Sequence, residues 1–339
     1  MKKTSLLAIG IMAIASVYSQ VADSSAVYFQ KGIEEKTAQH FLQASKYFDK
    51  AIDLNPTYKE ALLENGYVNL EMRKTDNAKG YFTKLYEIDP SNAVAIKELM
   101  ELCYNYRQFA KARELAAKCT GCLNAEKILG MCAYQQEDFG NSVKALSNYL
   151  SKNPTDAEAT YTMARCYLDM EEYKSAVPWY TKAVALDGEK NQWMYELGLL
   201  YYNNNDYKNA VVLFTKAADK GYPQNNDYNE NLGYAHIYSG NFEQGERMLL
   251  NLLERKPGNK EMLRDIAEAY YNNKMYDKSL GYCQKLMEMD MKDGKALYQA
   301  GMCFQKKGDK DKGQKMCDKA IELDPSLSSM RQKSMSGDF

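Results

Sequence analysis

Small side chains recur along this chain of 339 residues at a step of about 34 residues, and this spacing constrains the fold more than any other feature. Position 20 of each repeating unit is Ala, Gly or Ser, and position 8 is Gly or Ala in every unit except the one that carries Met100. Small residues that face each other let two antiparallel helices approach closely. The units begin at Ser25, Lys59, Ala93, Leu123, Ala157, Asn191, Asn226, Lys260 and Gly294.

Six of the seven prolines lie at the boundaries between units, where proline ends a helix before the next one starts. The seventh, Pro178, falls inside a predicted second helix and is expected to weaken or bend it. Within the units, apolar residues recur every three or four residues, as Met194, Leu197 and Tyr201 do, and a short polar stretch interrupts them. Each unit is therefore predicted to form a helix, a turn and a second helix.

The recurring residues resemble the tetratricopeptide repeat family: small side chains at positions 8 and 20, a bulky group at position 24, Ala at position 27 and Pro at position 32. The resemblance covers Ser25 to Leu327. It implies an all-α, right-handed superhelical solenoid of about nine helix-turn-helix repeats, each contacting only its neighbours. It also implies the binding of proteins or peptides. Position 24 is occupied in most units by Phe48, Phe82, Leu146, Tyr180, Phe214 and Leu249.

Two units depart from the regular length. The third, Ala93 to Cys122, is four residues short and lacks the boundary proline, and the sixth, Asn191 to Asn225, is one residue long. Because a deletion at a boundary changes how one helix pair stacks on the next, we expect an irregularity near residues 120–124. Residues 328–339 form a short C-terminal tail with few apolar side chains. The last unit is therefore expected to fray or to be covered by a partner.

The first nineteen residues are predicted to be a signal peptide. Lys2 and Lys3 precede a 12-residue, mostly apolar run from Leu6 to Val17, and small residues near its end allow cleavage before Gln20 or somewhat earlier. An uncleaved anchor is the alternative, but the run is shorter than the roughly 20 residues that span a bilayer. We expect a periplasmic or secreted protein that does not insert into the membrane after cleavage.

Eight cysteines follow this segment, and most occupy positions that the family buries. We therefore expect mainly buried thiols. Cys103, Cys119, Cys122 and Cys132 suggest a zinc site, but they fall at different levels of the helices, too far apart for tetrahedral coordination. Cys119 and Cys122 also resemble a redox pair, but they close a helix, where the dipole opposes a thiolate. A local disulfide, or no bond, is favoured over oxidoreductase activity.

Charge and histidine content narrow the function further. Lys and Arg number 44 against 45 Asp and Glu, and no long run of one sign favours nucleic acid or an anionic membrane. The two histidines are far apart, and His236 falls on a packing position. No nucleophile arrangement, phosphate loop or His-rich metal motif is present. We predict neither an enzyme nor a metal or cofactor site.

The resemblance implies that positions 2, 5, 9, 12 and 13 of each first helix line a concave groove. Many of these positions hold Tyr, which suits peptide binding because Tyr offers a large contact area and a hydroxyl at low entropic cost. Alternatively, several of these tyrosines pack between neighbouring units, and we expect about half to be accessible. The candidate groove residues are Tyr67, Tyr104, Tyr134, Tyr161, Arg165, Tyr195, Tyr202, Asn203, Tyr234, Tyr238, Tyr271, Asn272 and Tyr298.

Lys97 and Lys127 occupy position 5, which chaperone-binding members use to clamp a terminal carboxylate. Position 9 of the same units is Glu101 and Met131 instead of Asn, so that clamp is not supported. The leading hypothesis is a non-enzymatic scaffold that binds a partner protein or peptide in its groove. The alternative is an accessory subunit of a cell-envelope secretion or outer-membrane assembly complex.

Overall fold

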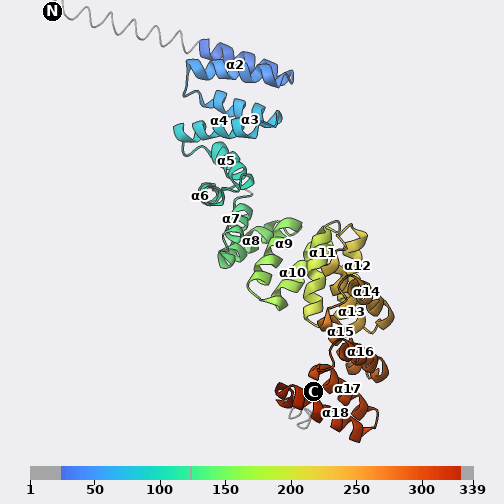
Figure 1. Cartoon of the computed structure of the whole chain (residues 1–339). Helices are drawn as coiled ribbons and strands as arrows, with labels where there is room; N and C mark the ends of the chain where they lie inside the picture. The colour runs from blue at the N-terminus through green and yellow to red at the C-terminus, as the bar shows by residue number, and fades with distance from the viewer. Residues whose placement is uncertain (1–23, 123, 330–339) are drawn as a thin grey trace, which may run out of the picture. The chain divides into compact units, whose positions relative to one another are not determined.

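The computed structural model describes residues 24–122 and 124–329, which form helices and one short 3-10 helix and contain no strand (Figure 1). The predicted all-α repeat fold is confirmed. The first helices of the repeats are residues 24–37, α3 (Lys59–Glu71), α5 (Ala93–Asn105), α7 (Ala125–Gln135), α9 (Ala157–Asp169), α11 (Asn191–Asn203), α13 (Asn226–Tyr238), α15 (Lys260–Asn272) and α17 (Gly294–Lys306). The second helices are α2 (Phe41–Leu54), α4 (Thr75–Ile88), α6 (Phe109–Lys118), α8 (Phe139–Lys152), α10 (Tyr173–Leu186), α12 (Tyr207–Asp219), α14 (Phe242–Arg255), α16 (Tyr276–Met289) and α18 (Lys310–Leu323), followed by η1 (Pro325–Leu327).

The chain divides after Leu186 into two compact units, each a stack of helix pairs. Within a unit the core is a chain of clusters rather than one central core. One cluster, for example, runs from Phe82 in α4 through Leu99 in α5 and Leu115 in α6 to Ile128 in α7. Each helix pair therefore depends on its neighbours for burial, as the spacing of small residues predicts.

The predicted starts of the repeats agree closely with the helices. Seven first helices, α3, α5, α9, α11, α13, α15 and α17, begin at the predicted residue. Of the other two, the helix of residues 24–37 is described from Ser24, one residue before the predicted Ser25, and α7 begins at Ala125 rather than at Leu123, which lies outside the described residues. The stacking irregularity near 120–124 includes that residue and remains a prediction. The predicted signal peptide and most of the C-terminal tail also lie outside the described range.

Steric contact explains why the small residues recur. A Cβ atom on Gly245, at position 20, would lie 2.5 Å from the carbonyl oxygen of Gly233, at position 8 of the same repeat. A Cβ atom on Gly198, also at position 8, would lie 2.7 Å from the ring of Phe214 at position 24. Position 20 is therefore small because it faces the backbone of the first helix, and position 8 is small because it faces a bulky side chain of the second helix.

A left-handed residue joins the two helices of every described repeat. Position 15 has positive φ in all nine, and it is Gly only at Gly240 and Gly308. In the second repeat Lys74 N–H donates to Asn69 O and Arg73 N–H to Leu70 O, both at 2.8 Å, which closes the helix with a Schellman-type turn. The non-glycine residues in this conformation are Gln39, Arg73, Arg107, Glu137, Glu171, Asn205 and Lys274.

The remaining expectations concern proline and cysteine. Helix α10 continues through Pro178 from Tyr173 to Leu186, and Pro178 is exposed. Cys119 and Cys122 form a disulfide. Of the two alternatives for this pair, a local disulfide or no bond, the structure contains the disulfide. The six other cysteines are buried free thiols, which confirms the expectation for them.

His236 is buried, as its packing position predicts, and burial lowers its pKa. Across residues 24–122 and 124–329 no group of three or more His, Cys, Asp or Glu side chains is placed to hold a metal. No helix in that range combines the length and apolar composition needed to cross a bilayer.

Candidate functional site

The first unit contains a pocket of about 270 Å³ to which three successive first helices contribute. Helix α5 supplies one side chain, α7 supplies three and α9 supplies four. The structure thereby brings four of the candidate groove residues into one site. The lining residues are Tyr104, Met131, Tyr134, Gln135, Glu158, Tyr161, Thr162 and Arg165.

Aromatic residues of the second helices support the three tyrosine rings of this pocket. Tyr104 packs on Phe109 with ring centroids 6.0 Å apart, and Tyr134 packs on Phe139 at 5.9 Å. The ring of Tyr161 meets that of buried Tyr180 edge-on at 5.7 Å. All three pocket tyrosines are half-buried. Each of these rings therefore packs against the second helix on one side and remains accessible on the other.

Hydrogen bonds and ion pairs fix the polar groups around the pocket. Tyr134 Oη donates to Asp169 Oδ2 at 2.8 Å, and Arg165 Nη2 lies 3.6 Å from Asp169 Oδ1. Burial, together with the bond to Asp169, raises the pKa of Tyr134 well above its usual value. Lys127 Nζ lies 3.0 Å from Glu158 Oε2 and 2.9 Å from Asp156 Oδ2. Neutral Tyr134 therefore serves as a hydrogen-bond donor, and both cations have carboxylate partners.

Tyr67 is the candidate in α3, one repeat before the pocket. Its hydroxyl donates to Glu98 Oε1 at 3.2 Å, and its ring meets buried Phe82 edge-on at 5.6 Å. Burial, with the Glu98 charge beside it, raises the pKa of Tyr67 to about 12. The side chain is half-buried and does not line the pocket.

In the second unit three of the six candidate groove tyrosines are more deeply packed than those of the pocket. Tyr195, Tyr234 and Tyr298 are each less than a tenth exposed. Tyr195 stacks on Tyr222 at 4.2 Å, and Tyr234 Oη donates to Asp265 Oδ2 at 2.9 Å. These contacts correspond to the packing alternative. Of the other candidates, Tyr202, Tyr238 and Tyr271 are half-buried, and Asn203 and Asn272 are exposed at helix ends.

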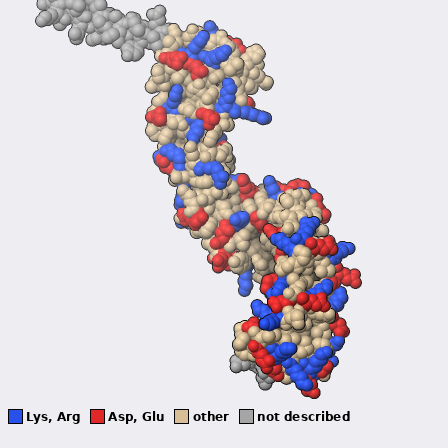
Figure 2. All heavy atoms as spheres, in the orientation of Figure 1, with Lys and Arg blue, Asp and Glu red and all other residues tan. Residues whose placement is uncertain are grey.

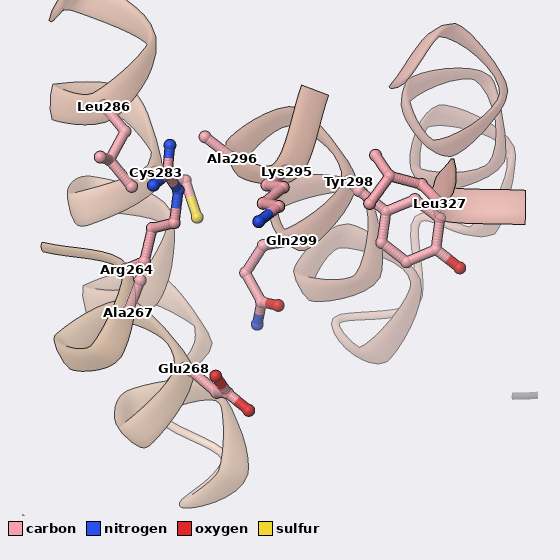
Figure 3. A pocket seen from close by; sticks show the side chains of 10 residues that line it. All are labelled: Arg264, Ala267, Glu268, Cys283, Leu286, Lys295, Ala296, Tyr298, Gln299 and Leu327. Carbon is pink, nitrogen blue, oxygen red and sulfur yellow. The ribbon is translucent and has the colours of Figure 1, made fainter. Parts of the chain in front are cut away.

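A second, smaller pocket of about 120 Å³ lies between α15, α16, α17 and η1 (Figure 3). Figure 3 shows Arg264 beside Cys283 on one side, with Lys295 and Gln299 of α17 facing them. Arg264 Nη2 lies 2.6 Å from Asp293 Oδ2, so its guanidinium is committed to a buried carboxylate of the chain itself. Tyr298 is the one candidate groove residue in this lining.

The visible face carries charges of both signs over both units, and neither sign gathers into one large patch (Figure 2). This mixture agrees with the formal net charge of −1. A polyanion such as nucleic acid would find no extended basic surface on this face.

Sequence comparison identifies the repeats. Family models described as tetratricopeptide repeat match residues 133–194, 194–225, 230–294 and 294–327. The chain belongs to the tetratricopeptide repeat family. Human tetratricopeptide repeat protein 6 is 26% identical over 166 residues, which is 48% of this chain and 31% of that protein. The human protein O-mannosyl-transferase TMTC3 is 25% identical over 157 residues, 43% of this chain and 17% of that one.

The chain thus spans less than a third of the length of these curated relatives. Among solved structures, it is similar to YrrB, described as a TPR protein with an unusual peptide-binding site. The identity is 25% and the TM-score 0.40, over 56% of this chain and 99% of the YrrB chain.

The tetratricopeptide frame also locates pocket residues that are not among the candidate groove residues chosen from the sequence. Met131 and Gln135 occupy positions 9 and 13 of their repeat, and Glu158 occupies position 2 of the next. All three are positions that the family assigns to the groove. Reading every groove position, instead of selecting mainly Tyr and Asn, would have found them. Thr162, at position 6, carries no such signal and is placed only by the packing of α9.

Proposed function

We propose that this chain is a non-enzymatic interaction scaffold that binds a segment of a partner protein against the first helices of its repeats. The pocket of α5, α7 and α9 carries the proposal, because Tyr104, Tyr134 and Tyr161 come from three successive repeats and meet in one concave site. Half-buried Tyr rings that pack on a second aromatic ring are already ordered, so binding a ligand costs little further side-chain entropy. One relative is named a mannosyl-transferase, but the match covers only 17% of it, and we propose no transfer activity for this chain.

The test is affinity capture from the cell-envelope fraction with three forms of the chain. The groove variant combines Tyr104→Ala and Tyr161→Ala, and the control is Tyr173→Ala, which removes a tyrosine that is 45% exposed on α10 and lies outside the pocket. Circular dichroism confirms that all three forms are folded. A partner that the wild type and the control retain, and that the groove variant loses, supports the proposal.

Two results contradict it. Recovery of no protein partner argues against a scaffold, and equal recovery by all three forms argues against this groove. If the captured partner is a membrane-embedded complex, the chain is an accessory subunit of an envelope secretion or assembly machine, which is the alternative form of the same binding role. Extraction of the native complex in detergent, followed by size separation, distinguishes that form from a free adaptor.

The proposal includes export by residues 1–19. The paired Lys2 and Lys3 before the apolar run support it. Mass spectrometry of the chain purified from its native cells tests this part. A mature chain that begins at or a few residues before Gln20 in the envelope or medium supports export, whereas a full-length chain in the cytosol contradicts it.

A further inference from the structure

The charged groups that line the pocket of α5, α7 and α9 are already paired within the chain. Arg165 lies beside Asp169, and Glu158 lies beside Lys127. A charged group of a ligand would lose hydration on entering and would have to break one of these pairs to gain a counter-charge. The pocket therefore disfavours acidic and basic side chains.

The rest of the lining suits an apolar group. Tyr104, Tyr134, Tyr161 and Met131 are the apolar and aromatic residues of the lining, and Tyr104 Oη donates to Met131 Sδ at 3.7 Å. Aromatic faces and methionine sulfur both make favourable contacts with apolar and aromatic side chains. The Tyr104 hydroxyl, which would otherwise need a polar partner, is satisfied by the sulfur.

The size of the pocket restricts what can enter. Its volume of about 270 Å³ equals that of about nine water molecules, enough for one large side chain but not for a folded element. Gln135 is exposed, so its amide remains accessible to the backbone next to that side chain.

From these observations we infer that the pocket anchors one large apolar side chain, such as phenylalanine, leucine or methionine, of the partner segment. The inference rests on the proposed function and specifies the residue class that this site selects. Burial of the anchor supplies binding free energy, and the internal charge pairs supply selectivity, because they leave an ionic side chain without a partner.

Capped amino acids test the inference directly on the full chain. The probes are the N-acetyl amides of phenylalanine, leucine, lysine and glutamate, and the readout is the NMR signal of the Met131 methyl group in protein labelled at methionine methyls. We expect the phenylalanine and leucine probes to shift this signal in a saturable way. The lysine and glutamate probes are expected to bind at least about tenfold more weakly. Substitution of Met131 by Leu assigns the signal.

Matched variants locate the binding. Tyr161→Ala is expected to weaken binding of the phenylalanine probe about tenfold, as removal of a central aromatic contact does, and Tyr173→Ala to leave it unchanged. Far-ultraviolet circular dichroism shows whether both variants keep the helical fold. An equal effect of the two substitutions would show that the Met131 signal reports a change elsewhere, and would overturn the assignment to this pocket.

Two further results would overturn the inference. A lysine or glutamate probe that shifts the Met131 signal as strongly as the phenylalanine probe would contradict the charge argument. If none of the four probes shifts the Met131 signal, the pocket does not bind an isolated side chain. If a partner is lost by the groove variant while the probes are silent, only this inference fails. If the probes bind and no partner is ever captured, the scaffold function fails instead.

Discussion

Gly198→Ala offers a direct test of why glycine recurs at position 8. Gly198 lies in α11, and a Cβ atom there would approach the Phe214 ring to 2.7 Å. Phe214 is fully buried, so the ring must move within a packed core. Inserting a methyl group into such a core costs typically about 1–3 kcal/mol. Replacing glycine by alanine in a helix interior returns about 0.5–1 kcal/mol.

Gly281→Ala is the matched control. Gly281 lies in α16 of the same unit, and a Cβ atom on it would meet no atom within 4 Å. The helix-propensity gain is common to both substitutions, so their difference isolates the packing cost, about 1–3 kcal/mol. Because the fifth repeat accommodates Ala164 at position 8 opposite Tyr180, we expect the lower half of this range. Gly281→Ala should stabilise the fold, and Gly198→Ala should destabilise it.

Equilibrium urea unfolding, followed by far-ultraviolet circular dichroism, measures both effects. The expected result is a lower transition midpoint for Gly198→Ala than for the wild type and a higher one for Gly281→Ala. If both variants raise the midpoint equally, the core tolerates the extra methyl group, and glycine at position 8 has another cause. The steric explanation of the repeat would then be wrong.

Three other properties follow from the structure. Gly240→Ala should lower stability by about 1–2 kcal/mol in thermal unfolding, because Gly240 has φ of +94°, and an unchanged transition would contradict this. Burial lowers the pKa of His236 in the folded chain, so as the pH falls this histidine is protonated in the unfolded chain before it is protonated in the folded one. Stability should therefore fall as the pH drops below the ordinary pKa of histidine, and His236→Gln should flatten that dependence of stability on pH. A thiol reagent should label none of the six buried cysteines in the native chain. It should label six cysteines in the unfolded chain, and all eight once the Cys119–Cys122 bond of the unfolded chain is also reduced. Labelling of the native chain would show that its core opens.

The candidate site was only partly predictable from the sequence. Tyr104, Tyr134, Tyr161 and Arg165 were expected in a groove from their repeat positions, and they do line one pocket. Tyr195 shares position 5 with Tyr161 but is buried. Tyr195 is buried because Tyr222, in the loop after α12, stacks on the Tyr195 ring. That loop belongs to the repeat with one extra residue, and its path is not encoded in the repeat pattern.

The sequence by itself determined the helices, their pairing and the step of the repeat. These features depend on contacts between residues a fixed distance apart in the chain, such as Gly198 and Phe214, so a periodic pattern is enough to specify them. The tertiary structure alone decided which groove tyrosines remain accessible and which charges are paired. Those outcomes depend on side chains from adjacent repeats, as between Lys127 and Glu158, where side-chain length and rotamer rather than periodicity set the contact.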